Sequence, residues 1–180
     1  MTTSAWTRLL TAAFVAAAAA PVAASAQATL DSVYVRATSA RADELDQKAQ
    51  ALYAAPKKWR QAAYLHQLAA GMRADDDPRM VHSLSMAANL LYYVGDVGAA
   101  RGTMERAARA AEAQGDVMKA AAAYVDAGYL AIAQHGDDRA MVLARKAQTL
   151  ASSPLLNAEQ RTTITRRLGY AQLVAMLPDK

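Results

Sequence analysis

Apolar residues recur along most of this chain with the period of an α-helix. The clearest stripes are Met80, Leu84, Ala87 and Leu91, and then Val117, Ala121, Tyr124, Gly128 and Ala131. This spacing puts one apolar face along each helix, whereas a half-buried strand would alternate polar and apolar residues. Alternation is confined to the three residues Val33-Tyr34-Val35, which are too few for a sheet. The pattern predicts an all-α fold.

Helix boundaries are marked by residues that favour helix ends. Asp77 before Pro78 has the form of an N-cap followed by a proline at the first helical position. Pro56 opens another helix, and Asn157 with Gln160 forms a capping-box pattern before a last helix at about 158–177.

Of all the segments in this sequence, the stretch GDVGAARG, residues 95–102, looks most like a ligand-binding loop. A phosphate-cradling loop should follow a strand, but this stretch follows a helical run. The pairs Gly95-Asp96, Gly115-Asp116 and Gly136-Asp137 instead fit a glycine that ends one helix and an aspartate that caps the next. Gly102 has no such explanation, because glycine inside a helix costs about 1 kcal/mol relative to alanine. We expect another helix or a bound partner to approach the backbone there.

The helical stripes form an internal repeat. Three windows match at identical internal spacing, and they start 38 and then 40 residues apart. Each window predicts two antiparallel helices with small residues where they touch. The matching positions are Asp46, Ala49, Gln50, Tyr53, Ala62, His66 and Ala69, then Leu84, Ala87, Ala88, Leu91, Ala100, Met104 and Ala107, then Tyr124, Ala127, Gly128, Ala131, Ala140, Ala144 and Ala147.

This arrangement resembles the tetratricopeptide repeat, in degenerate form, from Arg41 to Ala151. The resemblance implies an α-solenoid of about three helical hairpins, at about 41–75, 78–114 and 116–152, with the helix at 158–177 as a cap. An array needs such a cap because each hairpin leaves an apolar face that only a neighbour covers. The departures are a period nearer 40 than the family's roughly 34 residues and the replacement of the second-helix aromatic by His66, Met104 and Ala144.

The first 26 residues have the form of a secretory signal peptide. Arg8 lies in a short polar start, an apolar run continues to Ala20, and Ala24-Ser25-Ala26 is a cleavage site of the A-x-A type. The apolar run is about a dozen residues long, against the roughly 20 of a spanning helix. We therefore expect an exported, soluble and periplasmic chain that is cleaved after Ala26 and has no membrane span. Residues 27–40 would lead into a repeat domain at 41–177.

Composition narrows the classes of function. Alanine makes up 47 of the 180 residues, so the 54% hydrophobic content indicates closely packed helices rather than a large apolar core. The chain has no cysteine, which excludes disulfides and a lipid anchor on cysteine. Without Arg8 the formal charge falls from +4 to +3, a mild balance that argues against a nucleic-acid partner.

Convergent catalytic or metal-binding groups are not visible in the sequence. His66, His82 and His135 fall in different helices or hairpins at no metal-ligand spacing, and we interpret His66 as a packed core residue. The run Asp75-Asp76-Asp77 lacks the alternating ligands and the distal glutamate of a calcium loop. We expect a non-enzymatic protein with no cofactor and no metal, and a hydrolase with an unrecognised site is the least favoured alternative.

Charged runs are interpreted as solvated helix faces. Arg101, Glu105 and Arg109 form an i, i+4 ladder that would support a surface helix by tenths of a kcal/mol per pair. A basic strip on the last helix has the alternative role of binding an anion or a partner. It consists of Arg161, Arg166 and Arg167.

The first helices of the repeats predict a binding face, because the resemblance implies that they line the inner, concave side. The residues there that are left over from the packing stripe are Glu44, Gln47, His82, Ser85, Asn89, Tyr93, Val125, Tyr129 and Ile132. Aromatic anchors would supply contact area for an extended peptide or a helix, and amides would fix its backbone. The predicted partner site is Gln47, His82, Ser85, Asn89, Tyr93 and Tyr129.

We therefore expect a protein-interaction module or scaffold that binds a peptide or a partner helix on this face. One alternative is a periplasmic small-ligand or peptide-binding protein with an apolar pocket between helices. Another is that the same face binds a second copy of the protein.

Overall fold

A computed structural model describes residues 35 and 37–175. The predicted signal peptide, its cleavage site and most of the lead-in segment lie outside the described residues. The same holds for residues 176 and 177, at the end of the predicted last helix.

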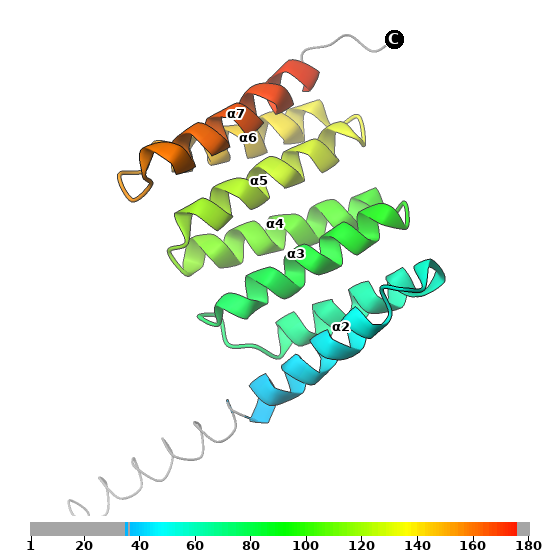
Figure 1. The fold of residues 1–180 in the computed structure, drawn as a ribbon. Coiled ribbons are helices and arrows are strands. Elements are labelled where there is room, and N and C mark those ends of the chain that lie inside the picture. The colour runs from blue at the N-terminus through cyan, green and yellow to red at the C-terminus, as the bar shows by residue number, and fades with distance from the viewer. Residues whose placement is uncertain (1–34, 36, 176–180) are drawn as a thin grey trace, which may run out of the picture. The chain divides into compact units, whose positions relative to one another are not determined.

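The described residues are all-α, with seven α-helices packed consecutively in antiparallel pairs (Figure 1). This confirms the predicted fold class. The first helix covers residues 37–51, and a 3-10 turn, η1 (Pro56–Lys58), leads into the second. The remaining helices are α2 (Trp59–Gly71), α3 (Pro78–Tyr93), α4 (Val97–Ala113), α5 (Val117–Ile132), α6 (Asp137–Ala151) and α7 (Ala158–Ala175).

Alanine occupies many of the contacts between successive helices. Ala62, Ala87, Ala107, Ala127 and Ala147 are all fully buried. Their small side chains let neighbouring helices approach closely, and larger side chains fill the space between them in one continuous core. Tyr124, Leu84, Leu143 and Ile164 are the largest apolar members that are almost completely enclosed.

The last helix covers the end of the array. Packed against both α6 and α5, α7 buries Ile164 and Leu168 in the common core. Its start is the predicted capping box, because the Asn157 side chain accepts from the backbone N–H of Gln160 at 2.8 Å. In return, the Gln160 side chain accepts from the backbone N–H of Asn157 at 3.0 Å.

Most of the predicted helix caps are confirmed. The side chains of Asp77, Asp96 and Asp116 accept hydrogen bonds from backbone N–H groups at the starts of α3, α4 and α5. Gly95 and Gly115, which precede two of these caps, have φ of 80° and 73°, in the left-handed region that glycine adopts without a steric cost.

The prediction for Gly136-Asp137 is wrong by one residue. The left-handed position before α6 is taken by His135, with φ of 56°, so that Gly136 is the N-cap and Asp137 lies inside the helix. Within the described residues the left-handed positions are therefore 95, 115 and 135, which are evenly spaced, and the pair Gly136-Asp137 begins one residue after the last of them. A side chain at Gly136 would bring its Cβ to 3.1 Å from the carbonyl oxygen of Ala131, which explains glycine there.

A buried polar cluster joins the first two helices to α3. His66 is completely buried, and its Nδ1 lies 2.6 Å from Asp46 Oδ1. Since a carboxylate only accepts, Nδ1 carries a proton, and Nε2 is hydrogen-bonded to the Tyr53 hydroxyl across 2.5 Å. Ser83 also donates to Asp46, at 2.8 Å, and the buried Arg73 guanidinium pairs with the same carboxylate. His66 is thus a packed core residue, as predicted, but a hydrogen-bonded one.

The cluster keeps Asp46 ionised. Burial raises the pKa of this carboxyl, but the hydrogen bonds from His66, Ser83 and Arg73 outweigh burial and hold the pKa below its usual value of 3.8. Arg73 has a further partner in Asp43, at 3.0 Å. The first hairpin is therefore fixed by charge and hydrogen bonding at positions where the other repeats have mainly small or apolar residues.

The expected helix neighbour of Gly102 does not exist in the described chain. Gly102 is exposed on α4, and no atom outside its own stretch of helix lies within 4 Å of where a Cβ would stand. That part of the prediction is wrong because this face of α4 turns away from both of its neighbours.

Gly102→Ala should raise the free energy of unfolding by about 1 kcal/mol, since alanine is the better helix former and meets no obstacle. As a control, Gly95→Ala should lower it by about 1–2 kcal/mol because of the left-handed backbone. Urea denaturation followed by circular dichroism measures both. A Gly102→Ala variant no more stable than the native chain would contradict the finding that the space around a Cβ at this position is open.

Asp46→Asn should lower the free energy of unfolding by about 3 kcal/mol at neutral pH, because Arg73 loses its most buried counter-charge. The folded-state pKa of Asp46 is depressed, so its contribution is complete above the usual value of 3.8 and is lost as pH falls through the lower folded value. The difference from the native chain should therefore close under acid conditions.

Urea denaturation over a pH series measures this difference. Asp138→Asn, at an exposed position, is the matched control and should change stability little at any pH. A deficit in Asp46→Asn that stays constant throughout the acid range would rule out the ionised cluster.

Candidate functional site

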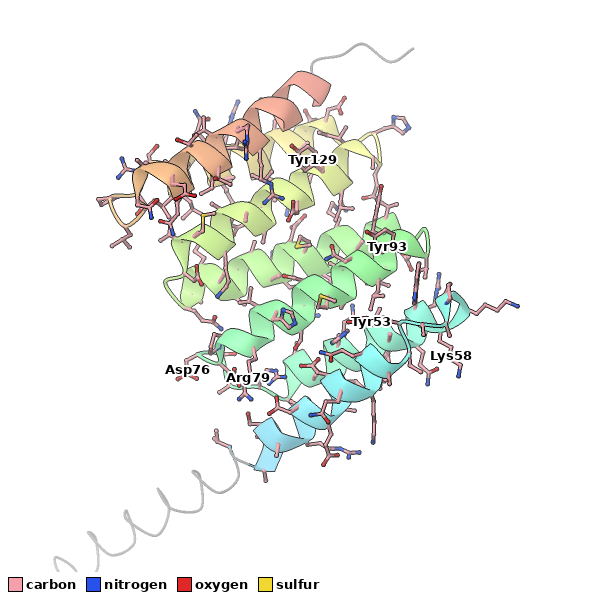
Figure 2. The ribbon with its side chains drawn as sticks, viewed as in Figure 1. Tyr53, Lys58, Asp76, Arg79, Tyr93 and Tyr129 are labelled. Carbon is pink, nitrogen blue, oxygen red and sulfur yellow. The ribbon has the colours of Figure 1, made fainter. Side chains whose placement is uncertain are left out.

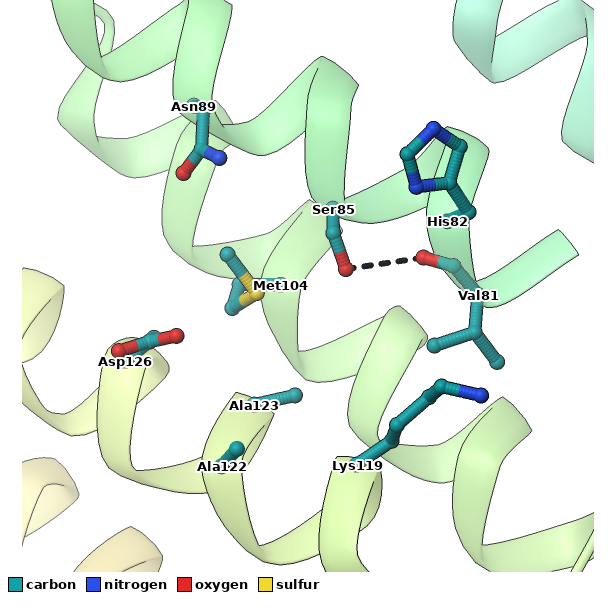
Figure 3. Close-up of a pocket in the computed structure, with 9 residues that line it drawn as sticks. All are labelled: Val81, His82, Ser85, Asn89, Met104, Lys119, Ala122, Ala123 and Asp126. Atoms are coloured by element: carbon teal, nitrogen blue, oxygen red, sulfur yellow. Dashed lines mark hydrogen bonds between the residues drawn. The ribbon is translucent and has the colours of Figure 1, made fainter. Parts of the chain in front are cut away.

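Two adjoining recesses lie between α3 and α5, with α4 beneath them. The first has a volume of about 230 Å³, and Figure 3 shows side chains from all three helices around it. The second has a volume of about 220 Å³. Asn89, Met104 and Asp126 line both recesses, so the two form one continuous hollow, which we call the α3–α5 groove.

Stacking of the helices explains the groove. Because α4 packs against both α3 and α5, it forms the floor, where Met104 is buried. The apolar stripe of α3 faces its neighbours, so polar residues at i, i+3 and i+7 remain along the groove. These are His82, Ser85 and Asn89, three of the six residues predicted for the partner site.

The polar side chains of α3 differ in whether they already make hydrogen bonds within the chain. Ser85 donates to the backbone carbonyl of Val81 at 2.8 Å (Figure 3), which ties its hydroxyl to its own helix. The side-chain amide of the exposed Asn89 makes no hydrogen bond within the described chain, and Figure 3 shows it directed toward Met104 and α5. Asn89 therefore offers a donor and an acceptor at the middle of the groove.

The second recess is framed by aromatic rings and one carboxylate. We call it the tyrosine recess. Its lining residues are Asn89, Tyr92, Met104, Asp126, Tyr129, Leu130 and Ala133. Tyr129, a fourth residue of the predicted site, donates its hydroxyl to the backbone carbonyl of Arg167 at 2.7 Å and is thereby held against α7.

Asp126 was not identified from the sequence. Its Oδ1 pairs with the guanidinium of Arg167, which reaches across from α7. Burial raises the pKa of this half-buried carboxyl, whereas Arg167 acts in the opposite direction without cancelling the effect. The sequence context predicted that Arg167 lies in a fully solvated strip. That prediction is wrong for Arg167, because α7 turns its side chain toward α5.

The expectation that Val125 lines the binding face is wrong. Val125 is 1% exposed and belongs to the core. The side of α5 that meets the groove instead carries Lys119, Ala122, Asp126 and Tyr129, which follow one another by three or four residues. Since Val125 lies next to Asp126 in sequence, it projects from a different side of the helix.

Two residues of the predicted site lie outside the groove. Tyr93 is 67% exposed at the end of α3, where its ring packs against Trp59 and Tyr92 at centroid distances of 5.7 and 5.8 Å. Figure 2 shows it well separated from Tyr129. Gln47 is exposed on the first helix and lines neither recess. The structure thus brings together four of the six predicted residues.

The ladder on α4 is more than a solvated face. Glu105 is 7% exposed and is hydrogen-bonded to Arg139 of α6. That bond, helped by Arg101 and Arg109 at 3.9 and 3.7 Å, holds the pKa of Glu105 below its usual 4.5 despite burial. The surface interpretation of Glu105 is wrong because the side chain of Arg139 reaches it from α6.

The series Tyr53, His66 and Asp46 has the order of a hydroxyl activated by an imidazole and a carboxylate. Complete burial of His66 and the inward bond of the Tyr53 hydroxyl give this series a packing role in the first hairpin.

In the described part of the chain, no three His, Cys, Asp or Glu side chains lie close enough to hold a metal ion. None of the described helices is long and apolar enough to cross a membrane.

A third recess, of about 530 Å³, lies between α6 and α7. It is lined mainly by polar side chains, including Gln148, Ser152, Arg161 and Thr165. Arg161 donates through Nε to the carbonyl of Leu156 at 3.1 Å, so part of its guanidinium is occupied by the turn before α7.

Comparison with protein-family models and with curated proteins finds no match to this chain. The groove must therefore be interpreted from its own geometry.

Proposed function

We propose that this protein is an exported, non-enzymatic interaction module that binds an extended peptide or a partner helix in the α3–α5 groove. The observation that carries the proposal is the continuity of the two recesses around Asn89, whose amide has no partner within the described chain. An amide at the centre of an apolar-floored groove can pair with both the N–H and the C=O of a bound backbone.

The size of the recesses favours a segment over a compact molecule. Pockets for drug-sized ligands enclose roughly 300–1,000 Å³ in one space, whereas the groove divides its volume between two recesses of about 230 and 220 Å³. Two small recesses that lie one after the other along the groove fit successive side chains of one bound peptide segment. Met104 on the shared floor is a flexible side chain that adapts to different apolar partners.

The architecture supports the same proposal. The three sequence windows resemble tetratricopeptide repeats, and we take the array as a degenerate solenoid of that kind, in which the first helix of each hairpin faces the inner side. Residues 1–26 have the form of a signal peptide, and we propose that the module acts in the periplasm.

Asn89→Ala should weaken the binding of peptides selected from a random library on the native protein. Loss of one or two hydrogen bonds costs about 1–2 kcal/mol, or roughly 5- to 30-fold in Kd. Gln61→Ala, which removes an exposed amide from α2, is the matched control and should leave Kd unchanged. Fluorescence anisotropy measures Kd, and circular dichroism checks that both variants fold.

Equal affinities for the native protein and Asn89→Ala would remove the groove as the binding site. For the alternative of a small-ligand protein, the recess between α6 and α7 is large enough for a ligand, but its lining is mainly polar rather than apolar as that alternative expects. A native mass spectrum that shows a bound small molecule, lost on Ser152→Trp, would favour that alternative over the peptide groove.

A further inference from the structure

The tyrosine recess has a distinctive chemistry. Among the residues that line it, Asp126 is the only one with a formal charge. Two tyrosine rings flank the recess from different helices, Tyr92 from α3 and Tyr129 from α5. Aromatic faces and a carboxylate both attract cations, the first through the ring quadrupole and the second through its charge.

Asp126 can bind a second cation besides Arg167. One oxygen, Oδ1, pairs with Arg167, whereas Oδ2 accepts no hydrogen bond from the described chain. A carboxylate has about four acceptor positions on its two oxygens. Lys119, the other cation of the groove, lines the first recess and pairs with Asp116 at 2.7 Å, so it does not neutralise Asp126.

The two rings are held in place before any ligand arrives. Tyr92 is 50% exposed, and its ring packs against Tyr93 at 5.8 Å with the planes 57° apart. Tyr129 is fixed by its hydrogen bond to Arg167. Because the rings and the carboxylate need little rearrangement, the ordering cost of binding is small.

We propose that the tyrosine recess binds a basic side chain, the ammonium of lysine or the guanidinium of arginine, from the segment that lies in the α3–α5 groove. The cation lies between the rings of Tyr92 and Tyr129 and donates to Oδ2 of Asp126, while Asn89 holds the adjoining backbone. This inference rests on the proposed peptide-binding function and adds the chemistry of the ligand to it.

The test compares the peptides acetyl-Gly-Ala-Lys-Ala-Gly-amide and acetyl-Gly-Ala-Nle-Ala-Gly-amide, in which norleucine keeps the four side-chain carbons of lysine without its ammonium group. Titration into the native protein is followed by the backbone amide NMR signals of Leu130 and Ala133, which line the recess. The lysine peptide should bind about fivefold more tightly than the norleucine peptide, as expected for a half-exposed ion pair with aromatic contact.

Variants should change this preference in opposite directions. Asp126→Asn should abolish it, and Tyr92→Leu should reduce it by about threefold without affecting the norleucine peptide. Arg167→Gln removes the competing guanidinium and should increase the preference for lysine. Asp138→Asn, which removes an exposed carboxylate from α6, should have no effect. A purely structural ion pair would not make Asp126→Asn and Arg167→Gln differ in sign.

Equal affinity for the lysine and norleucine peptides would overturn the inference. If library peptides still bound in an Asn89-dependent way, the proposed function would survive that result. Tetramethylammonium distinguishes a free organic cation from a peptide-borne one. Asp126-dependent shifts with tetramethylammonium but not with the lysine peptide would overturn the peptide-borne form.

Discussion

The close approach of successive helices through alanine is the constraint on which the rest of this structure depends. Residues such as Ala87, Ala107 and Ala127 are fully buried where one helix meets the next. A larger side chain at such a contact would force the helices apart or strain its neighbours. Because α4 is held close to both α3 and α5, it forms the floor of a groove whose two sides have a fixed separation.

Alanine contacts bury little apolar area, and polar pairs between different helices add specific contacts. Asp46 joins the first helix to His66, Arg73 and Ser83, Glu105 joins α4 to Arg139 of α6, and Asp126 joins α5 to Arg167 of α7. Removing one partner of a buried pair costs more than the pair itself contributes, so these contacts penalise any shift between hairpins. The pair at Asp126 also borders the groove, and there the packing of α7 and the chemistry of the tyrosine recess depend on the same carboxylate.

The sequence predicted the helices well because their signals are local. Periodicity, the caps at Asp77, Asp96 and Asp116, and the capping box at Asn157 each depend on residues within a few positions of one another. The groove was predicted in part, because four of the six residues of the predicted site line it. Val125 was expected on the same face but lies in the core, since the rotation of one helix against another is a long-range property. The contacts of Asp126 with Arg167 and of Glu105 with Arg139 gave no local signal, since these partners lie 41 and 34 residues away. The sequence did indicate part of the Asp46 cluster, because polar residues occupy three of the repeat positions. The pattern did not show that these residues contact one another.

The central claim is that the α3–α5 groove, rather than the opposite face of the array, is where this protein meets its partner. Photo-crosslinking in cells that produce the full chain tests it directly, with benzoylphenylalanine placed at position 82 in the groove, which leaves Asn89 intact, or at position 61 on α2. We predict a crosslinked product from position 82 that is absent from position 61, with a different polypeptide as the attached chain. Crosslinking from position 61 alone, or equally from both positions, would contradict it.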